Sequence, residues 1–422
     1  MIDLKKLADN LDEWQEALNK RGEEYDLKKV LEQATKFGQL VKELDEIRAQ
    51  QNEAAKNKDV AEGKRLKGLE AAKGQEIEDT SKIGAFAGDI PNIPLWDVSA
   101  GGEESKRILE TVGEPPAIEN PKDHIDLGTS LNFLDIERAA NTSGSRFYFL
   151  KNQAVELEFA LVRWVMDLLK EKGFELMIPP VMMNAQVMSA GGYLGKNADE
   201  IYKTQDDLYL IGTSEQSILG YHMAEIIDVP KRYAAFSTCF RREAGSYGKD
   251  VKGIIRTHQF DKVEMFSFVL PEKSEKELDF ITDIQEEILK GLEIPYQKVL
   301  LAAGDLGTPS AKTIDMESWL PSQQRYRETH SASNCTDWQA RRANIRHRVA
   351  GERVSPPLLK SYGRAGRLAG KSKTEFVHTL NGTAIAIGRT LVALLENHQQ
   401  PDGSIKIPKV LHPYLSFKEI RR

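Results

Sequence analysis

Cysteine is scarce in this sequence. The 422 residues include only two cysteines, Cys239 and Cys335, and these do not form a C-x-x-C motif. Two such residues exclude a disulfide framework and a four-cysteine zinc site. Because this usage suits a reducing compartment, we expect a cytoplasmic protein.

Long apolar runs and glycine-rich phosphate loops are missing as well. No stretch approaches the ~18 apolar residues of a membrane helix, and charges interrupt the N-terminal MIDLKKLADN where a signal peptide needs an apolar run. We therefore expect no membrane partner. The sequence contains neither G-x-x-x-x-G-K-[ST] nor a strand-anchored G-x-G-x-x-G. Any nucleotide must be held in another way.

Charge is nearly balanced over the whole chain, with 58 Lys and Arg against 64 Asp and Glu and a net charge of −6. Binding of a polyanion must therefore come from local basic patches. One such patch is FRREAGSYGKDVKGIIRTHQF at 240–260, where Glu243 and Asp250 face five cations, namely Arg241, Arg242, Lys249, Lys252 and Arg256. The excess predicts a bound anion.

The N-terminal part predicts an antiparallel helical hairpin. Apolar residues recur in steps of four and three at Val30, Ala34, Phe37, Val41 and Leu44, and a looser run follows a polar break at 57–59 through Leu66, Leu69, Ile77 and Ile83. Two arms of ~30 residues would extend ~45 Å. The tip is basic, with Lys56, Lys58, Lys64, Arg65 and Lys67. This segment alone leaves two roles open, a dimerising coiled coil and an arm that contacts RNA.

A segment rich in Pro, Gly and acidic residues at 91–121 marks a domain boundary. We expect an N-terminal domain at 1–100, a linker at 101–120 and a second domain at 121–422. The second domain opens with a helix at 152–172, and short strands with a helix at 272–292 follow. This order predicts an α+β fold with an antiparallel sheet and helices on one side.

The basic patch has the residue types of a nucleotide site. Strands predicted at 239–242 and 254–260 would place Arg241 and Glu243 on one face and Arg256 and Phe260 on a face of the partner strand. An arginine grips phosphate oxygens, an aromatic ring stacks on a base, and a carboxylate accepts from an exocyclic amine. A hairpin with exposed salt bridges is the alternative.

Three further groups carry chemistry. Glu328 and Ser331 offer oxygen ligands of the kind that Mg²⁺ prefers, although such residues are usually surface groups. Arg389 falls in an apolar helix predicted at 384–395, where a cation needs an anion, either a ligand or a buried carboxylate. Thr213 and Glu215 would share a face at the end of a strand.

Together these groups resemble the class II aminoacyl-tRNA synthetases. The long helix and the strand that ends in Pro179-Pro180 resemble motif 1, the run at 240–264 resembles motif 2, and LNGTAIAIGRTLVALLE resembles motif 3. The short motifs TSE, YRE, SNCTDWQARR and TLNGT are similar to those of seryl-tRNA synthetases, and so is the N-terminal hairpin. The resemblance spans nearly the whole chain and implies a class II catalytic domain, a tRNA-binding arm and a homodimer.

The resemblance also implies substrates and residue roles. It implies that L-serine is activated with ATP and Mg²⁺ and is transferred to serine tRNA, and it leaves open whether selenocysteine tRNA is charged too. The implied serine site consists of Thr213, Ser214, Glu215, Glu264, Asn381 and Thr383. The implied ATP site consists of Arg241, Arg242, Glu243, Arg256, Phe260, Glu328, Ser331 and Arg389, of which Glu328 and Ser331 would hold the metal. The tRNA contacts would be Lys249, Lys252, Lys56, Lys58, Lys64, Arg65 and Lys67.

Two features depart from the family pattern. Thr329 and His330 stand between Glu328 and Ser331, where family members usually have small or apolar residues, so the charge near the metal site is open. The span 341–373 is longer and strongly basic, and it either guides the tRNA acceptor end or is a solvated insertion. Two other functions stay open: a ligase that loads a carrier protein, and an RNA-binding paralogue without catalysis.

Overall fold

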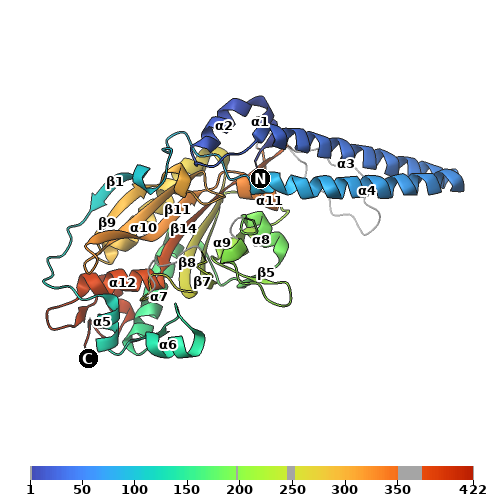
Figure 1. Cartoon of the computed structure of the whole chain (residues 1–422). Helices are drawn as coiled ribbons and strands as arrows, with labels where there is room; N and C mark the ends of the chain where they lie inside the picture. Colours follow the sequence, from blue (N-terminus) through green and yellow to red (C-terminus); the bar gives the residue numbers. More distant parts are fainter. Residues whose placement is uncertain (1, 196–197, 245–251, 350–372, 422) are drawn as a thin grey trace, which may run out of the picture.

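The computed structural model describes residues 2–195, 198–244, 252–349 and 373–421 (Figure 1). Lys249 and most of the basic span at 341–373 lie outside the described residues. Both cysteines are buried and free. No helix in the described ranges has the length and apolar character needed to cross a membrane.

The helical hairpin is confirmed. After two short helices, α1 (Leu4–Asp9) and α2 (Leu11–Asn19), the chain forms α3 (Leu27–Lys56) and α4 (Val60–Asp89). Each long helix begins at an aspartate cap, since Asp26 accepts from the Lys29 N–H and Asp59 from the Glu62 N–H. In Figure 1 the pair projects as an arm from the rest of the molecule.

The seam of the hairpin differs from the expected one. Val30 and Leu66 are buried as expected, but Phe37 and Val41 are each 37% exposed, and Leu40 is buried instead. An α-helix turns through 3.6 residues rather than the 3.5 of a strict seam, so the contact face moves to a neighbouring row of side chains along the arm. Ion pairs between the helices, such as Arg48 with Glu70 at 2.9 Å, flank the seam.

An eight-stranded sheet forms the body, in the order β1-β9-β10-β11-β14-β8-β7-β4. Its strands are β1 (Arg107–Val112), β4 (Glu175–Met177), β7 (Lys231–Phe240), β8 (Gln259–Val269), β9 (Tyr296–Leu300), β10 (Lys312–Leu320), β11 (Arg325–Asn334) and β14 (His378–Ala386). All neighbours are antiparallel except β4 and β7. The antiparallel α+β prediction is therefore confirmed. The segment expected to be a linker, 101–120, contains β1, and the domain boundaries stay a prediction.

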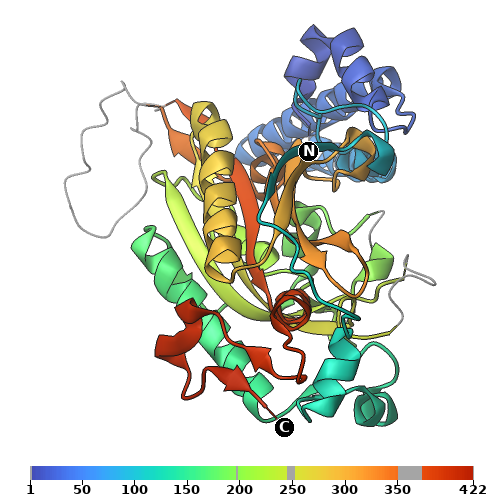
Figure 2. The ribbon, with the colours of Figure 1, turned by 90° about the vertical axis from the view of Figure 1, so that its left-hand side faces the viewer.

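Three long helices bury their apolar stripes against this sheet: α7 (Gln153–Glu171), α10 (Ser274–Gly291) and α12 (Ile387–His398). The helix predicted at 152–172 matches α7, where Leu157, Leu161 and Val165 are fully buried. In Figure 2, α10 runs along the strands and the N-terminal helices lie at one end of the sheet. The remaining helices are short: α5 (His124–Ser130), α6 (Ile136–Ser143), α8 (Ala185–Gly191), α9 (Glu215–Tyr221) and α11 (Trp338–Ala343).

Three predicted boundaries near the motifs are wrong. The return strand begins at Gln259 rather than at 254, because Gly253 has a φ of +84° and the chain bends there. The helix expected from 384 begins at Ile387, since Ala384–Ala386 still belongs to β14, which pairs with β8. Glu215 is the first residue of α9 rather than part of a strand end.

Candidate active site

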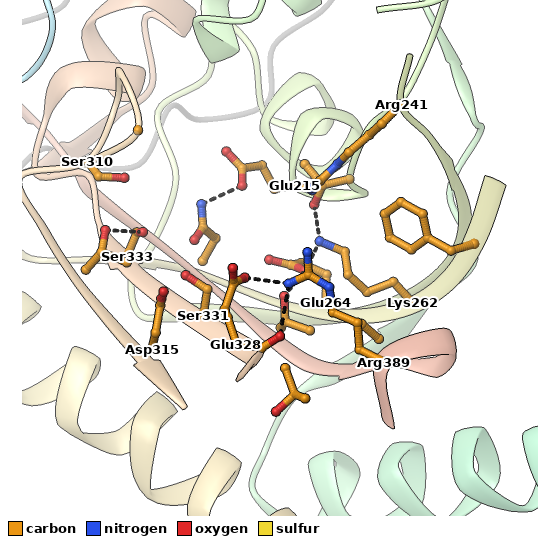
Figure 3. Close-up of a pocket in the computed structure, with 18 of the residues that line it drawn as sticks. Glu215, Arg241, Lys262, Glu264, Ser310, Asp315, Glu328, Ser331, Ser333 and Arg389 are labelled. Atoms are coloured by element: carbon orange, nitrogen blue, oxygen red, sulfur yellow. Dashed lines mark hydrogen bonds and ion pairs between the residues drawn. The ribbon is translucent and has the colours of Figure 1, made fainter. Parts of the chain in front are cut away.

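One cavity of about 430 Å³ lies against the sheet and gathers most of the predicted site residues (Figure 3). Its walls come from β8, β10, β11, β14, the starts of α9 and α12 and the loops between the elements. The predicted residues that line it are Thr213, Glu215, Arg241, Glu243, Arg256, Phe260, Glu264, Glu328, Ser331, Asn381, Thr383 and Arg389. Side chains far apart in the sequence therefore meet at one place.

Some predicted site residues lie elsewhere. Among the described residues, Ser214 and Arg242 do not line the cavity. The Ser214 hydroxyl donates to the Ala235 carbonyl at 3.4 Å, and the Arg242 guanidinium lies over the Tyr202 ring. Lys252 is exposed beside a second, open cavity. The basic tip residues Lys56, Lys58, Lys64, Arg65 and Lys67 are exposed around the α3–α4 turn, at the end of the arm farthest from the sheet in Figure 1.

Arg241 and Glu243 reach the cavity from the end of β7. The Arg241 Nε donates to the Gly212 carbonyl at 3.2 Å, and its guanidinium carbon lies 5.3 Å from the centre of the Phe260 ring. β7 ends at Phe240, and Glu243, three residues further on, has a φ of +52°. Its Oε2 lies 2.9 Å from an Arg256 nitrogen. The predicted grouping holds, although a bent chain rather than strand alternation produces it.

A β-bulge brings Glu328 and Ser331 to the same face. Residues three apart in a regular strand point to opposite faces. Here Met316 pairs with His330 but Glu317 pairs with Glu328, so Thr329 is the extra residue. His330 is buried and lies outside the set of described residues that line the cavity. Burial lowers its pKa to about 4, so at neutral pH it adds no charge beside Glu328 and Ser331.

Arg389 and Glu328 form an ion pair across the cavity. Arg389 comes from the first turn of α12, and its Nη1 lies 2.7 Å from Glu328 Oε1. Enclosure by the cavity walls would raise the pKa of Glu328, but the charge of Arg389, reinforced by Arg241 and Arg256, lowers it. The cation expected at 389 does have a carboxylate partner, and that carboxylate is itself a cavity residue.

Asp315 is a third acidic residue here, and the sequence reasoning missed it. It lies on β10 opposite Ser331, and its Oδ1 is a buried acceptor without a hydrogen-bond partner in the described chain. Burial, together with the charge of Glu328, raises its pKa well above the usual range. The described residues contain no group of three or more His, Cys, Asp and Glu side chains arranged around one metal. Carboxylate and hydroxyl oxygens of this kind fit Mg²⁺, which takes its other ligands from water and phosphates.

The cavity also holds a buried lysine among acids and hydroxyls. Lys262 forms an ion pair with Glu264 and donates to the Thr213 hydroxyl at 2.8 Å. Thr383 donates to Glu264 at 3.3 Å. Lys262 and Glu264 are each more than 95% buried. The sequence reasoning missed Lys262, although alternation along β8 places it on the same face as Phe260 and Glu264.

Glu215 is a second buried acid that lines the cavity. Its carboxylate accepts from the Asn381 amide at 2.5 Å and from the Gln339 amide at 2.8 Å. Burial raises its pKa to about 7, and the charge of Glu264 adds to the shift. Gln339 was also missed, although it belongs to the quoted run SNCTDWQARR. A carboxyl that titrates near neutrality in a cleft is a common feature of functional sites.

A histidine from α5 supports the bent segment that carries Arg256. The Ile254 N–H donates to His124 Nε2 at 3.3 Å, and Nδ1 of this ring lies 3.2 Å from Glu396 Oε1. A Cβ at Gly253 would lie 2.1 Å from His124 Nε2, so only glycine allows this approach. The segment was predicted as a strand, and nothing in its own sequence indicated this support.

The comparisons with known proteins agree with this geometry. Residues 199–398 match the family model described as the tRNA synthetase class II core domain (G, H, P, S and T). The antiparallel sheet and the cavity lined by motif residues accordingly place the chain in the class II aminoacyl-tRNA synthetases.

Closer relatives narrow the assignment. Residues 1–94 match the model of the seryl-tRNA synthetase N-terminal domain. The chain is 44% identical to the serine–tRNA ligase of Mycolicibacterium smegmatis, with 98% of each chain covered. It also superposes on seryl-tRNA synthetase from Pyrococcus horikoshii complexed with ATP, with a TM-score of 0.85, 38% identity and 100% and 99% coverage. For the cytoplasmic enzyme of Naegleria fowleri in complex with AMP, the TM-score is 0.82 with 30% identity and the same coverage. The chain belongs to the seryl-tRNA synthetase family.

The buried lysine generates a stability prediction. Lys262→Met should lower the free energy of unfolding by about 3 kcal/mol at pH 8, because it leaves Glu264 buried without its cation. The charge of Lys262 lowers the pKa of Glu215, which burial raises to about 7, so the loss of Lys262 raises this pKa further above the unfolded value. The folded state then holds more protons, and the loss should grow from pH 6 to pH 8. Urea unfolding at both pH values measures it.

Lys290→Met is the matched control. Lys290 pairs with Glu286 at 3.0 Å with its side chain 55% exposed, so its loss should cost no more than ~0.5 kcal/mol. An equal, pH-independent loss in both variants would contradict the role given to Lys262.

Proposed function

We propose that this chain is a serine–tRNA ligase. It activates L-serine with ATP to form seryl-adenylate and then transfers serine to the 3′ end of serine tRNA. The observation that carries the proposal is a single cavity that brings together arginines, an aromatic ring and a buried lysine with two glutamates. The names of the relatives support the same activity.

ATP occupies the arginine-rich end. Arg241 binds the α-phosphate, and Arg256 and Arg389 hold the distal phosphates in a bent conformation. Phe260 stacks on adenine, and Glu243 accepts from the adenine amine. The ion pairs of Arg256 with Glu243 and of Arg389 with Glu328 keep these cations in place before ATP arrives. Arg242 is not among the described residues that line the cavity, and its part in ATP binding stays a prediction.

Serine occupies the other end. Its ammonium group pairs with the carboxylates of Glu215 and Glu264, and its hydroxyl bonds to Thr383 and Glu264. Asn381 holds Glu215 in place, and Thr213 contributes a hydroxyl beside Lys262. Because these buried groups need a hydroxyl partner, alanine would leave them unpaired and is rejected by up to ~10⁴-fold. Threonine must be excluded by shape.

Mg²⁺ would be held by Glu328 and Ser331, with Asp315 adjoining them across the strand pair. When bound, it neutralises charge on the phosphate oxygens. The residues of this chain do the rest. Arg241 places the α-phosphorus in line with the serine carboxylate and stabilises the charge that accumulates during attack. Holding two anions together in this geometry removes most of the entropic barrier, so no protein nucleophile is needed.

The arm and a second copy of the chain complete the proposed assembly. The exposed cations at the arm tip contact the phosphates of serine tRNA, and Lys252 contacts its acceptor stem. A homodimer would cover the apolar surface around the edge strand β4, where Phe159 is 66% exposed and Ile178 is 84% exposed. Cytoplasmic location and the basic span as a tRNA guide stay predictions.

One experiment tests the function against the alternatives. Pyrophosphate exchange is measured with each common amino acid, and charging of total tRNA is measured next. We expect exchange with serine and charging of serine tRNA. Exchange without charging would point to a carrier-protein ligase. No exchange would mean an RNA-binding paralogue.

Substitutions of Arg241 and Lys252, both in the motif 2 run, should affect different steps of the reaction. Arg241→Ala should abolish both exchange and charging, because it removes the cation at the α-phosphate. Lys252→Ala should leave exchange within about twofold and raise the KM for tRNA severalfold, since one phosphate contact is lost. Steady-state kinetics of both assays at two salt concentrations measure this. Identical behaviour of the two variants would refute the separation.

The titration of Glu215 should make the kcat/KM for serine depend on pH. Below about pH 7 the carboxyl is protonated and cannot pair with the serine ammonium group, whereas above it the carboxylate is charged. The kcat/KM for serine should therefore rise from pH 6 to pH 8, because this parameter reports the free enzyme. Glu215→Gln should give a low and flat profile. The kcat/KM for ATP over the same range is the control, and a flat wild-type serine profile would rule out this role.

A further inference from the structure

Arg21 is a buried cation whose position ties the N-terminal domain to the active-site cavity. It lies in the turn after α2 and is only 9% exposed. Its Nε donates to the Asn92 carbonyl at 3.0 Å, Nη1 to the Leu306 carbonyl at 3.0 Å and Nη2 to the Ser310 carbonyl at 2.5 Å. Both terminal nitrogens also lie 3.5 Å from the Gly307 carbonyl.

Burial of the Arg21 guanidinium costs desolvation free energy, so other interactions must compensate for it. Burial lowers the pKa of Arg21 to about 10, so the group stays charged at neutral pH. A guanidinium has five donors in a fixed planar fork, which lets one side chain bond several carbonyl oxygens at once. An ammonium group would reach fewer of them. The arrangement therefore depends on arginine in particular.

Three of the four carbonyls that Arg21 bonds, those of Leu306, Gly307 and Ser310, belong to a loop that lines the cavity. We call residues 305–310 the wall loop, since Asp305 and the four residues at 307–310 line the cavity. Figure 3 places Ser310 on the same side as Ser333. Ser333 pairs in register with Asn381, which holds Glu215. The wall loop thus borders the end of the cavity that is proposed for serine.

Asn92 holds the same loop from the other end of the arm. Its N–H donates to the Thr308 carbonyl at 2.8 Å, and its side-chain amide donates to the Pro309 carbonyl at 2.8 Å. Arg21 precedes α3, which begins at Leu27, and Asn92 follows α4, which ends at Asp89. Residues at both ends of the helical arm therefore donate hydrogen bonds to the wall loop.

We propose that Arg21 is a positioning residue of the active site: it holds the wall loop in the conformation that closes the serine end of the cavity. The proposal rests on the proposed function for its substrate, while the contacts with the wall loop do not depend on that function. The consequence is a serine site whose shape is set by the N-terminal domain.

The test uses the full chain and serine-dependent pyrophosphate exchange without tRNA. Arg21→Met should raise the KM for serine about tenfold, because small displacements of a substrate-positioning wall are costly, and should leave the KM for ATP within about twofold. Arg21→Lys keeps the charge but loses the planar fork, so its KM for serine should fall between. Asn92→Ala should also raise the KM for serine. This variant tests the proposal if Arg21→Met does not fold.

Arg232→Met is the control for lost stability alone. Arg232 makes a two-point ion pair with Glu277 of α10 and is absent from the described cavity lining, so this change should lower Tm without altering the KM for serine. A merely structural role for Arg21 would behave in the same way, with less active enzyme and an unchanged KM. That result would overturn the proposal.

Hydrogen exchange separates this inference from the proposed function. In Arg21→Met, peptides covering the wall loop should exchange faster than in the wild type, while β7 and β8 stay protected. If the wild type showed no serine-dependent exchange of pyrophosphate, the proposed function would fail, and the protection of the wall loop would still test the contacts of Arg21. Unchanged protection would overturn the positioning role whatever the substrate.

Discussion

The ion pair between Lys262 and Glu264 is the interaction on which the cavity depends. Glu215 and Glu264 are both buried, and the charge of Glu264 raises the pKa of Glu215. The charge of Lys262 beside these carboxylates allows them to stay charged in a site that excludes most water. Loss of this cation would therefore be strongly destabilising. The proposed serine site therefore keeps an excess of negative charge. Binding of the serine ammonium group would reduce the repulsion that remains between Glu215 and Glu264.

The strand pairings make this arrangement possible. β8 carries Lys262 and Glu264, and its neighbour β14 brings Thr383 into register with Glu264. On the other side of β14, β11 contributes Glu328 and Ser331 across a bulge. A rigid sheet fixes the separations between these side chains more firmly than loops would. Glu243 and Arg256, which lie outside the strands, need separate supports such as His124.

Sequence patterns were enough for the class of fold and for most of the cavity. The arm, the α7 helix and the antiparallel sheet follow from periodicity, and the family resemblance carried the residue roles. Patterns failed where geometry is set by the partner strand or by distant residues. The bulge at Thr329 depends on pairing with β10, and the bend at Gly253 depends on His124. Asp315 and Gln339 were missed because a single polar residue among other polar residues carries little local signal.

Contacts between segments far apart in the sequence are the hardest to infer from it, and here they join the arm to the catalytic sheet. Arg21 bonds residues of the wall loop almost the length of the catalytic domain away in sequence. Trp338 extends the same junction, since it packs in one apolar cluster with Leu7, Leu18 and Leu27 and donates its indole N–H to the Ile90 carbonyl. Trp338 and Gln339 are adjacent in α11, so the helix that anchors the arm also presents the amide that holds Glu215. The base of the arm and the carboxylate end of the cavity thus share one set of packed residues, and neither can shift without the other.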